Sequence, residues 1–238
     1  MGDTQGETQR PSAATWVPAA GEATVTLLLR HGQTPLSVEK RFAGRTDIGL
    51  TSHGAAQAAA AAARLAGSGA AVILTSPLRR ARDTASAVAL ATGVPVVVAE
   101  EFGEADFGAW DGLTFAEARD RWPEEMAAWL ADPAVAPPGG ESISAVSGRV
   151  LEGLGEALAS YRGQTVVIVS HVTPIKVLLA HALLAPLASL YRMHLDVACL
   201  SRADWYPDGP AVVRSLNDTG HLRAAEGAEN ALAAGKHL

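Results

Sequence analysis

Arginine or histidine ends three of the apolar runs in this sequence of 238 residues. The runs read LLLRHG over residues 27–32, VILTSPLRR over residues 72–80 and VIVSHVTP over residues 167–174. A buried cation is costly unless an anion or a hydrogen-bond partner accompanies it. If the three runs lie side by side, the sequence predicts a pocket for an anion. A phosphoryl group suits such a pocket, because the guanidinium fork matches phosphate oxygens.

Elements of regular structure between these runs must position the polar side chains. Strands are expected at residues 24–29, 71–76, 95–100, 165–170, 197–207 and 210–217. Helices are expected at residues 51–67, 76–93, 113–122, 142–161 and 174–184. Because strands and helices alternate, the pattern favours a mostly parallel sheet covered on both faces, a three-layer α/β/α sandwich. Functional groups of such a sheet lie beyond the carboxyl ends of its strands.

Two of the expected helices begin with capping signals. Thr51 or Ser52 is expected to cap the first helix. Ser76 is expected to cap the second, with Pro77 at its first position. The positive end of the second helix would then add to the binding of an anion.

The chain is interpreted as one domain with ragged ends. Residues 1–22 are rich in Gly, Thr, Gln, Pro and Ala, which predicts a flexible linker or lead-in. Residues 23–217 carry all the expected elements, and the chain length does not require a second domain. Residues 218–238 are predicted to form a weakly ordered tail.

Composition and charge argue against several functional classes. The net charge of −6 disfavours general binding to nucleic acid or to a membrane surface. Cys199 is the only cysteine, so no intramolecular disulfide can form, which is typical of a reducing compartment. The first residues lack the basic start and apolar core of a signal peptide, and Lys176 and His181 interrupt the most apolar stretch, residues 171–190. The sequence predicts a cytoplasmic protein with no nucleic-acid or membrane partner.

Six sequence blocks, in order along residues 24–217, resemble one known family. The blocks are LLLRHGQT, RFAGRTDIGLTSHGAAQA, TSPLRRARDTA, EFGEADFGAWDGLT, PPGGES and VVIVSHVTPIK. In order and spacing they are similar to the histidine phosphatase superfamily, whose members include cofactor-dependent phosphoglycerate mutases and many phosphatases. The resemblance implies a phosphoglycerate mutase-like fold.

The same resemblance implies catalytic roles for five residues. His31 falls on the nucleophile of the family, and Arg30 and Arg80 fall on phosphate ligands. His171 is the second pocket histidine and is expected to be protonated, so that it shares the charge of the phosphoryl oxygens with the arginines. Glu104 falls on the proton donor of the family.

Further positions are expected to contact the substrate. The residues are Gly32, Gln33, Thr34, Ser37, Arg45 and Val172. Gly32 is expected to let the backbone approach the phosphate closely. Ser37 departs from the family, which usually carries Asn there, so either Ser37 donates in its place or that contact is missing. Arg45 faces the substrate or is a surface charge, and the sequence leaves both interpretations open.

Phosphate monoesters are among the slowest substrates to hydrolyse without a catalyst, so two successive transfers through His31 are useful. Glu104 would protonate the departing alkoxide and then activate the water that releases the phosphate. Because Glu104 must start protonated, an acid pH optimum is predicted. The scheme needs no metal and no cofactor.

Three functions remain open at this point. The favoured one is a phosphomonoesterase acting on a small phosphorylated metabolite such as a sugar phosphate, a nucleotide or α-ribazole phosphate. A mutase-type phosphotransferase would need more cations for a second anionic group, and no lysine lies between Gly112 and Ser142. A non-catalytic phosphate-binding module would be expected to lack His31 or Glu104.

Within the family, the blocks look most like the α-ribazole phosphatase-like branch. They are similar in particular to the acid phosphatase module that follows a ribonuclease H domain in some actinobacterial proteins. The region before residue 23 resembles the linker of such proteins, and the sequence leaves two interpretations open: a module from a ribonuclease H-containing protein, or a stand-alone relative. A homodimer is a further expectation.

Overall fold

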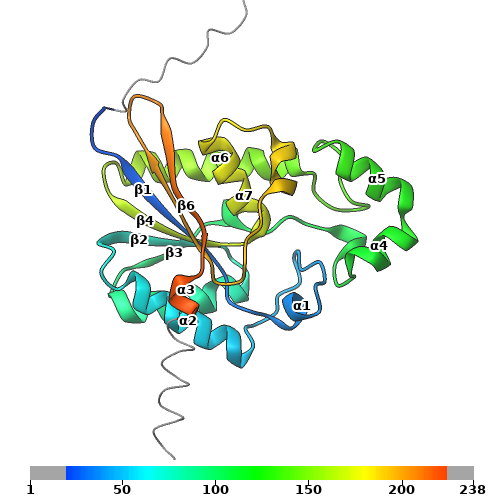
Figure 1. Ribbon diagram of the computed structural model, residues 1–238, viewed down its shortest axis with the longest axis horizontal. Helices are drawn as coiled ribbons and strands as arrows, with labels where there is room; N and C mark the ends of the chain where they lie inside the picture. Colours follow the sequence, from blue (N-terminus) through cyan, green and yellow to red (C-terminus); the bar gives the residue numbers. More distant parts are fainter. Residues whose placement is uncertain (1–19, 224–238) are drawn as a thin grey trace, which may run out of the picture.

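The computed structural model of the chain describes residues 20–223. A six-stranded sheet with the order β3-β2-β4-β1-β5-β6 forms its centre. Helices α6 and α7 lie on one face of the sheet, and α2 and α3 lie on the other (Figure 1). The predicted three-layer α/β/α sandwich is confirmed. Most of the predicted linker at residues 1–22 and of the predicted tail at residues 218–238 lies outside the described residues.

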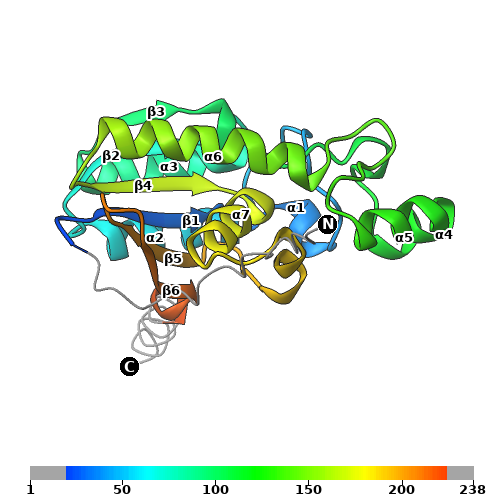
Figure 2. The same ribbon diagram turned by 90° about the horizontal axis from the view of Figure 1, so that it is seen from above.

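All six predicted strands are present. They are β1 (Thr24–Arg30), β2 (Ala70–Thr75), β3 (Val96–Val98), β4 (Thr165–Ser170), β5 (Leu200–Trp205) and β6 (Ala211–Asp218). Strands β1, β4, β2 and β3 pair in parallel, whereas β5 is antiparallel to β1 and β6 is antiparallel to β5. The parallel strands point toward α1, α4 and α5, which lie beyond their carboxyl ends (Figure 2).

The helices include all the predicted ones. They are α1 (Pro35–Val38), α2 (Ser52–Leu65), α3 (Arg79–Thr92), α4 (Phe115–Arg121), α5 (Pro123–Ala131), α6 (Ile143–Ser160) and α7 (Val172–Ala182). Three short 3-10 helices are η1 (Glu100–Phe102), η2 (Gly108–Trp110) and η3 (Leu187–Arg192). The segment that forms α5 was not predicted as a helix. No helix within residues 20–223 is long and apolar enough to cross a membrane.

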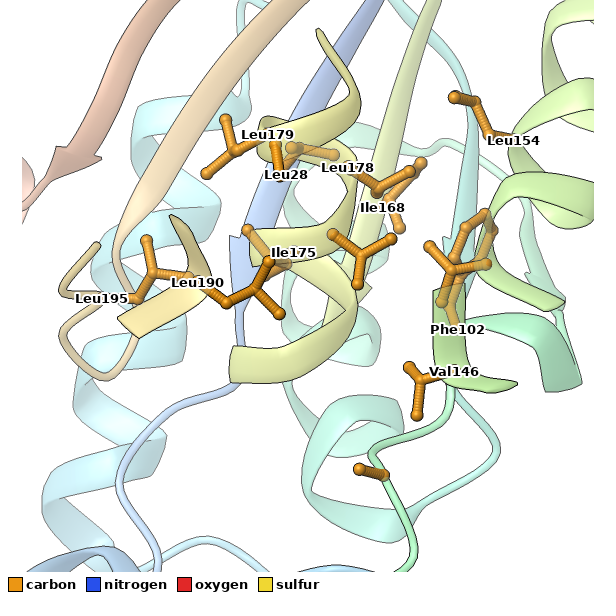
Figure 3. Close-up of a cluster of buried hydrophobic side chains, with 14 of the residues drawn as sticks. Leu28, Phe102, Val146, Leu154, Ile168, Ile175, Leu178, Leu179, Leu190 and Leu195 are labelled. Carbon is orange, nitrogen blue, oxygen red and sulfur yellow. The ribbon is translucent and has the colours of Figure 1, made fainter. Parts of the chain in front are cut away.

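The sheet divides the core into two parts because successive side chains of a strand point to opposite faces. Leu28 of β1 and Ile168 of β4 belong to the cluster beneath α6 and α7, together with Ile175 (Figure 3). Leu29 and Val167, one residue away on each strand, belong to the cluster beneath α2 and α3. With both faces covered, the central strands consist mostly of apolar residues.

The prediction for the start of α3 is wrong. The helix begins at Arg79, and Leu78 precedes it without a side-chain cap. The hydroxyl oxygen of Ser76 accepts the backbone N–H of Leu78 at 3.2 Å and does not cap the helix. At α2 the prediction is confirmed, because the side chain of Thr51 accepts the backbone N–H of Gly54.

Candidate active site

The three polar strand ends predicted from the sequence meet at one edge of the sheet. β4 pairs with β1 on one side and with β2 on the other, so the ends of the three strands are adjacent. Arg30 ends β1, His171 follows β4, and Arg80 lies in the first turn of α3 after β2. The rings of His31 and His171 lie 5.1 Å apart between their centroids.

His31 presents one ring nitrogen to a cavity. Its Nδ1 atom lies 2.8 Å from the carbonyl oxygen of Gly32. Because a carbonyl only accepts, Nδ1 carries the proton, and the lone pair of a neutral ring is on Nε2. Burial, followed by the positive charges of Arg30 and Arg80, holds the pKa of His31 well below its ordinary value. His31 is therefore neutral and nucleophilic over a wide pH range.

Arg80 and His171 form a buried pair behind His31. The Nε atom of Arg80 donates to Nδ1 of His171 at 3.2 Å. The Nε2 atom of His171 therefore carries the proton and lies 2.7 Å from the hydroxyl of Ser76, to which it donates. Burial and then the charge of Arg80 hold the pKa of His171 well below its ordinary value. The prediction of a protonated His171 is wrong for this arrangement, because the hydrogen bond from Arg80 requires a neutral ring.

The two neutral histidines predict a loss of stability in mild acid. In the unfolded chain each imidazole takes up a proton near pH 6.5, whereas the folded chain resists this uptake to a lower pH. The unfolded state thus binds more protons below about pH 6.5, and the free energy of unfolding falls as the pH falls, by up to about 1.4 kcal/mol per pH unit for each histidine. Denaturant titrations at pH 7.5 and 5.5 measure the difference.

A His171→Asn variant should show a smaller difference between the two pH values than the wild type. His194→Ala is the matched control, because the His194 side chain is 80% exposed. The acidic groups whose pKa is lowered, such as Asp204, titrate below this window. An unchanged slope in His171→Asn would show that another group is responsible.

Arg30 offers free donor capacity to the cavity. Its Nη1 atom donates to the carbonyl oxygen of Leu195 at 2.6 Å, which fixes the guanidinium at the cavity wall. Its Nε atom is buried without a hydrogen-bond partner among residues 20–223. Its Nη2 atom makes no hydrogen bond within the same residues, so an anion in the cavity that Arg30 lines could accept from the guanidinium.

Glu104 lines the same cavity as His31 and Arg30, on the loop after η1, and is 5% exposed. Its Oε1 atom accepts the backbone N–H of Ala105 at 2.8 Å and of Thr173, in the first turn of α7, at 3.3 Å. The two amides orient the carboxyl group toward the cavity. Glu104 is therefore placed to exchange a proton with a group bound near His31.

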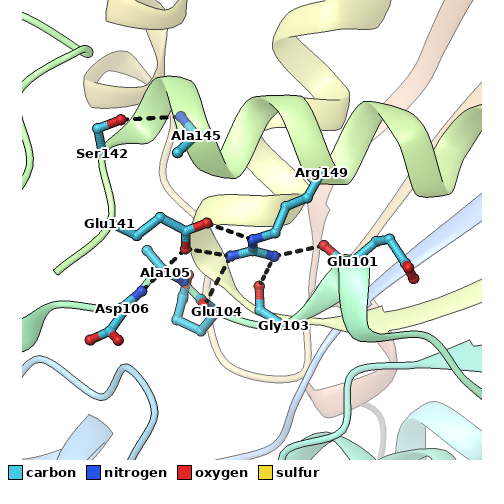
Figure 4. A network of polar contacts seen from close by, with 9 residues as sticks. All are labelled: Glu101, Gly103, Glu104, Ala105, Asp106, Glu141, Ser142, Ala145 and Arg149. Atoms are coloured by element: carbon cyan, nitrogen blue, oxygen red, sulfur yellow. Dashed lines mark hydrogen bonds and ion pairs between the residues drawn. The ribbon is translucent and has the colours of Figure 1, made fainter.

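A second carboxylate and an arginine support the backbone that carries Glu104 (Figure 4). Arg149 of α6 donates from Nε and Nη2 to the carboxylate of Glu141, at 2.8 and 2.9 Å. It also donates to the carbonyl oxygens of Glu101, Gly103 and Glu104, at 2.7, 2.8 and 3.1 Å. This pair was not predicted from the sequence, since most of its partners are backbone atoms that any residue supplies.

Replacement of Arg149 by methionine is expected to lower both stability and activity. The change leaves the half-buried Glu141 unpaired and three carbonyls without their donor, which should cost roughly 2–4 kcal/mol of unfolding free energy. A displaced Glu104 should lower kcat by about 10- to 100-fold. Arg82→Met, on the exposed side of α3, is the control. If kcat of the folded variant equals that of the wild type, Arg149 does not position Glu104.

The cavity at this edge of the sheet has a volume of about 290 Å³. Its polar lining consists of Arg30, His31, Thr34, Ser37, Arg41, Glu104, Thr173 and Lys176. Its apolar and aromatic lining consists of Phe42, Ala43, Phe107, Trp129, Ile143, Val172, Leu190 and Tyr191. Arg80 and His171 do not line it, so their influence reaches a ligand through His31 and through the electrostatic potential.

The predicted substrate contacts divide into two groups. Thr34, Ser37 and Val172 line the cavity. The Gln33 side chain instead accepts the hydroxyl of Thr51 at 2.9 Å, at the start of α2. Arg45 is exposed and outside the lining, which favours the surface-charge interpretation.

The structure changes the expected roles of two of these positions. Ser37 donates its one hydroxyl proton to the carbonyl of Thr34 at 2.8 Å, so it does not replace the asparagine of the family as a donor. A side chain at Gly32 would collide with the carbonyl oxygen of Gly54. Gly32 therefore allows close packing against α2, and its approach to phosphate stays a prediction.

Two cationic residues of the cavity were missed as site residues. Lys176 was noted only because it interrupts an apolar stretch, and Arg41 lies outside the predicted contacts. The signal of Lys176 is weak, because a charge in an amphipathic helix usually faces solvent, and Arg41 lies outside the helices. Within residues 20–223 no group of three or more His, Cys, Asp or Glu side chains is placed to hold a metal ion.

A mostly parallel α/β sheet that presents a neutral histidine, arginines and a carboxyl group to one cavity is the arrangement expected of enzymes that act on phosphate esters. Residues 26–219 match the family model of the histidine phosphatase superfamily (branch 1). The chain belongs to that superfamily, as the sequence blocks predicted.

Named phosphatases are among the proteins similar to this chain. The solved structure of mycobacterial glucosyl-3-phosphoglycerate phosphatase in complex with VO3 is 32% identical, with a TM-score of 0.77, and the match covers 83% of this chain and 100% of that one. The α-ribazole phosphatase of Shigella flexneri is 30% identical, with a TM-score of 0.74, over 82% of this chain and 96% of that one. The predicted phosphatase and α-ribazole phosphatase-like relationships are confirmed.

A longer relative covers more of this sequence. The bifunctional protein Rv2228c of Mycobacterium tuberculosis is 50% identical over 216 residues, which are 90% of this chain and 59% of the relative. The chain thus spans less than two thirds of that relative's length. The origin in a ribonuclease H-containing protein stays a prediction.

Proposed function

We propose that the chain hydrolyses small phosphate monoesters, without a metal, through a phosphohistidine at His31. The observation that carries the proposal is the free Nε2 lone pair of His31, which Gly32 fixes by accepting the Nδ1 proton. It faces a cavity that Arg30 and Glu104 also line. Nucleophile, anion ligand and proton donor therefore surround one space, as an in-line transfer requires.

In the first step, Nε2 of His31 attacks phosphorus and forms an N–P bond. The bond from phosphorus to the ester oxygen breaks, and its electron pair goes to the departing oxygen, which takes a proton from Glu104. Arg30 binds the non-bridging oxygens through its free donor capacity. The positive potential of Arg80 adds to the stabilisation of the transition state.

In the second step, Glu104 removes a proton from water, and the oxygen of that water attacks phosphorus. The N–P bond breaks, and its electron pair returns to Nε2 of His31. Inorganic phosphate leaves, and the two groups regain their starting states with Glu104 protonated. Because the carboxyl group must be protonated at the outset, we expect an acid pH optimum.

Hydrolysis is favoured over mutase-type transfer because the segment between Gly112 and Ser142 contributes no cation to the cavity. A mutase must hold a second anionic group during rephosphorylation, and a set of cations is needed for it. The segment between Gly112 and Ser142 has Arg119 and Arg121 as its only cations, and neither lines the cavity. A non-catalytic phosphate-binding role is disfavoured because His31 and Glu104 both face the cavity.

Release of phosphate from phenyl phosphate by the wild-type protein tests the proposal. Acid quenching is avoided, because a phosphohistidine is acid-labile. Alkaline quenching after brief exposure to labelled substrate should leave label on the peptide that contains His31. Activity that persists in a chelator is expected. Absence of both turnover and label would refute the function, and label on another residue would refute the mechanism.

A further inference from the structure

The carbonyl group of Gly32 decides which ring nitrogen of His31 carries the lone pair, so the contacts that hold this carbonyl bear on the reaction. The backbone of His31 is fixed by the sheet, because its N–H donates to the carbonyl oxygen of Ser170 at 3.0 Å. The imidazole ring depends on the next peptide unit, which joins Gly32 to Gln33. The carbonyl oxygen of that unit accepts the Nδ1 proton of His31 at 2.8 Å.

Gln57 of α2 holds the other side of the same peptide unit. Its Oε1 atom accepts the backbone N–H of Gln33 at 2.9 Å. This contact fixes the orientation of the Gln57 amide, because an N–H needs an acceptor, and the Nε2 atom then donates to Nε2 of His53 at 3.1 Å. Gln57 does not line the cavity, so its influence on a substrate passes through the peptide unit that it holds.

The start of α2 brings the Gln57 side chain close to this peptide unit. A side chain at Gly54 would collide with the backbone of Gln33, and one at Gly32 would collide with the carbonyl oxygen of Gly54. Gln57 lies three residues beyond Gly54 on the same helix. The backbone N–H of Thr51 also donates to the carbonyl oxygen of Gln33 at 2.9 Å. α2 therefore fixes the segment that follows His31 through both the N–H and the carbonyl group of Gln33.

We infer that Gln57 is a positioning residue for the nucleophile, because it orients the peptide unit whose carbonyl keeps the proton of His31 on Nδ1. The inference rests on the proposed function, in which Nε2 of His31 attacks phosphorus. A peptide group whose N–H donates a hydrogen bond is polarised, which makes its carbonyl oxygen a stronger acceptor. The position of the proton on an imidazole is set by the hydrogen bonds that its nitrogens make. Without the acceptor at residue 57 the peptide unit can rotate, and a ring protonated on Nε2, which cannot attack, becomes populated.

Two substitutions of Gln57 test this role. Gln57→Met removes the acceptor and nearly keeps the length of the side chain, whereas Gln57→Glu keeps an acceptor oxygen. In Gln57→Met the rate at which phenyl phosphate labels His31 should fall by about 10- to 100-fold, the scale expected when a reacting group is misplaced. Gln57→Glu should retain most of the wild-type rate.

The proton position on His31 is a readout that a general loss of packing would not move. Long-range proton–nitrogen correlation spectra at about pH 7.5, above the ordinary pKa of histidine, distinguish a neutral imidazole protonated on Nδ1 from one protonated on Nε2. The His31 signal is assigned by its absence in His31→Ala. It should show the Nδ1 proton in the wild type and in Gln57→Glu, and a substantial Nε2-protonated fraction in Gln57→Met.

Gln164→Met is the matched control, because Gln164 is exposed and does not line the cavity. It should change neither the labelling rate nor the His31 signal. A Gln57→Met variant with the wild-type rate would overturn the inference, and so would a reduced rate with an unchanged His31 signal. If the wild type neither hydrolyses phenyl phosphate nor becomes labelled, the proposed function fails. The His31 signals of the wild type and Gln57→Met then still decide whether Gln57 holds the proton on Nδ1.

Discussion

Alanine in place of His31 is expected to lower kcat for phenyl phosphate by on the order of 10⁴-fold or more, the scale seen when a covalent nucleophile is removed. The alanine side chain cannot form the N–P bond, and the nearby His171 cannot replace it. The two nitrogens of His171 are engaged by Arg80 and Ser76, and it does not line the cavity. Steady-state rates of phosphate release measure the effect, and alkaline-quenched label should be lost in parallel.

Folding of the His31→Ala variant should be preserved. The ring is buried beside two positive charges, and the one hydrogen bond lost from it goes to the carbonyl of the next residue, Gly32. The unfolding free energy should therefore change by no more than about 1–2 kcal/mol. His194→Ala serves as the control for removing an imidazole. Equal activities in wild type and His31→Ala would refute the phosphohistidine mechanism.

The edge of the sheet could be predicted from the sequence because it depends on local patterns. Apolar runs of strand length end in Arg30, in the segment before Arg80 and in His171. Right-handed crossovers through the helices make these strands parallel, so their carboxyl ends lie at the same edge of the sheet. What could not be predicted is which hydrogen bonds the side chains make. His171 is neutral because Arg80, 91 residues away, donates to it.

Long-range contacts also explain the residues that were missed. Arg149 supports Glu104 through carbonyl groups of the backbone, and no residue type in that loop signals this. Ser76 has the sequence position of a helix cap, but its hydroxyl is oriented toward His171. A pattern gives the type of a residue and its distance along the chain. Which of several possible hydrogen-bond partners a side chain contacts is decided by the packed structure.

Glutamine in place of Glu104 is expected to lower kcat by about 10²- to 10⁴-fold for an alkyl phosphate such as glycerol 3-phosphate. Glutamine keeps the shape of the side chain, and its carbonyl oxygen can still accept the backbone N–H of Ala105, so the fold should be unaffected. The amide has no acidic proton for the departing alkoxide. An alkoxide is a poor leaving group unless it is protonated as it departs. The absence of the proton from Glu104 therefore accounts for the large decrease in kcat.

The size of the loss should depend on the leaving group. For p-nitrophenyl phosphate, whose phenolate departs without protonation, the rate of the first step should fall far less than for glycerol 3-phosphate. The burst of nitrophenol should persist, while turnover is slowed at the second step. The alkaline side of the optimum should flatten in Glu104→Gln, because the group whose protonation supports the first step is gone. Asp106→Asn, two residues further on the same loop and outside the cavity lining, is the control. Equal losses in the rate of the first step for both leaving groups, or wild-type activity that rises steadily from about pH 5 to pH 9, would assign the proton transfer to another group.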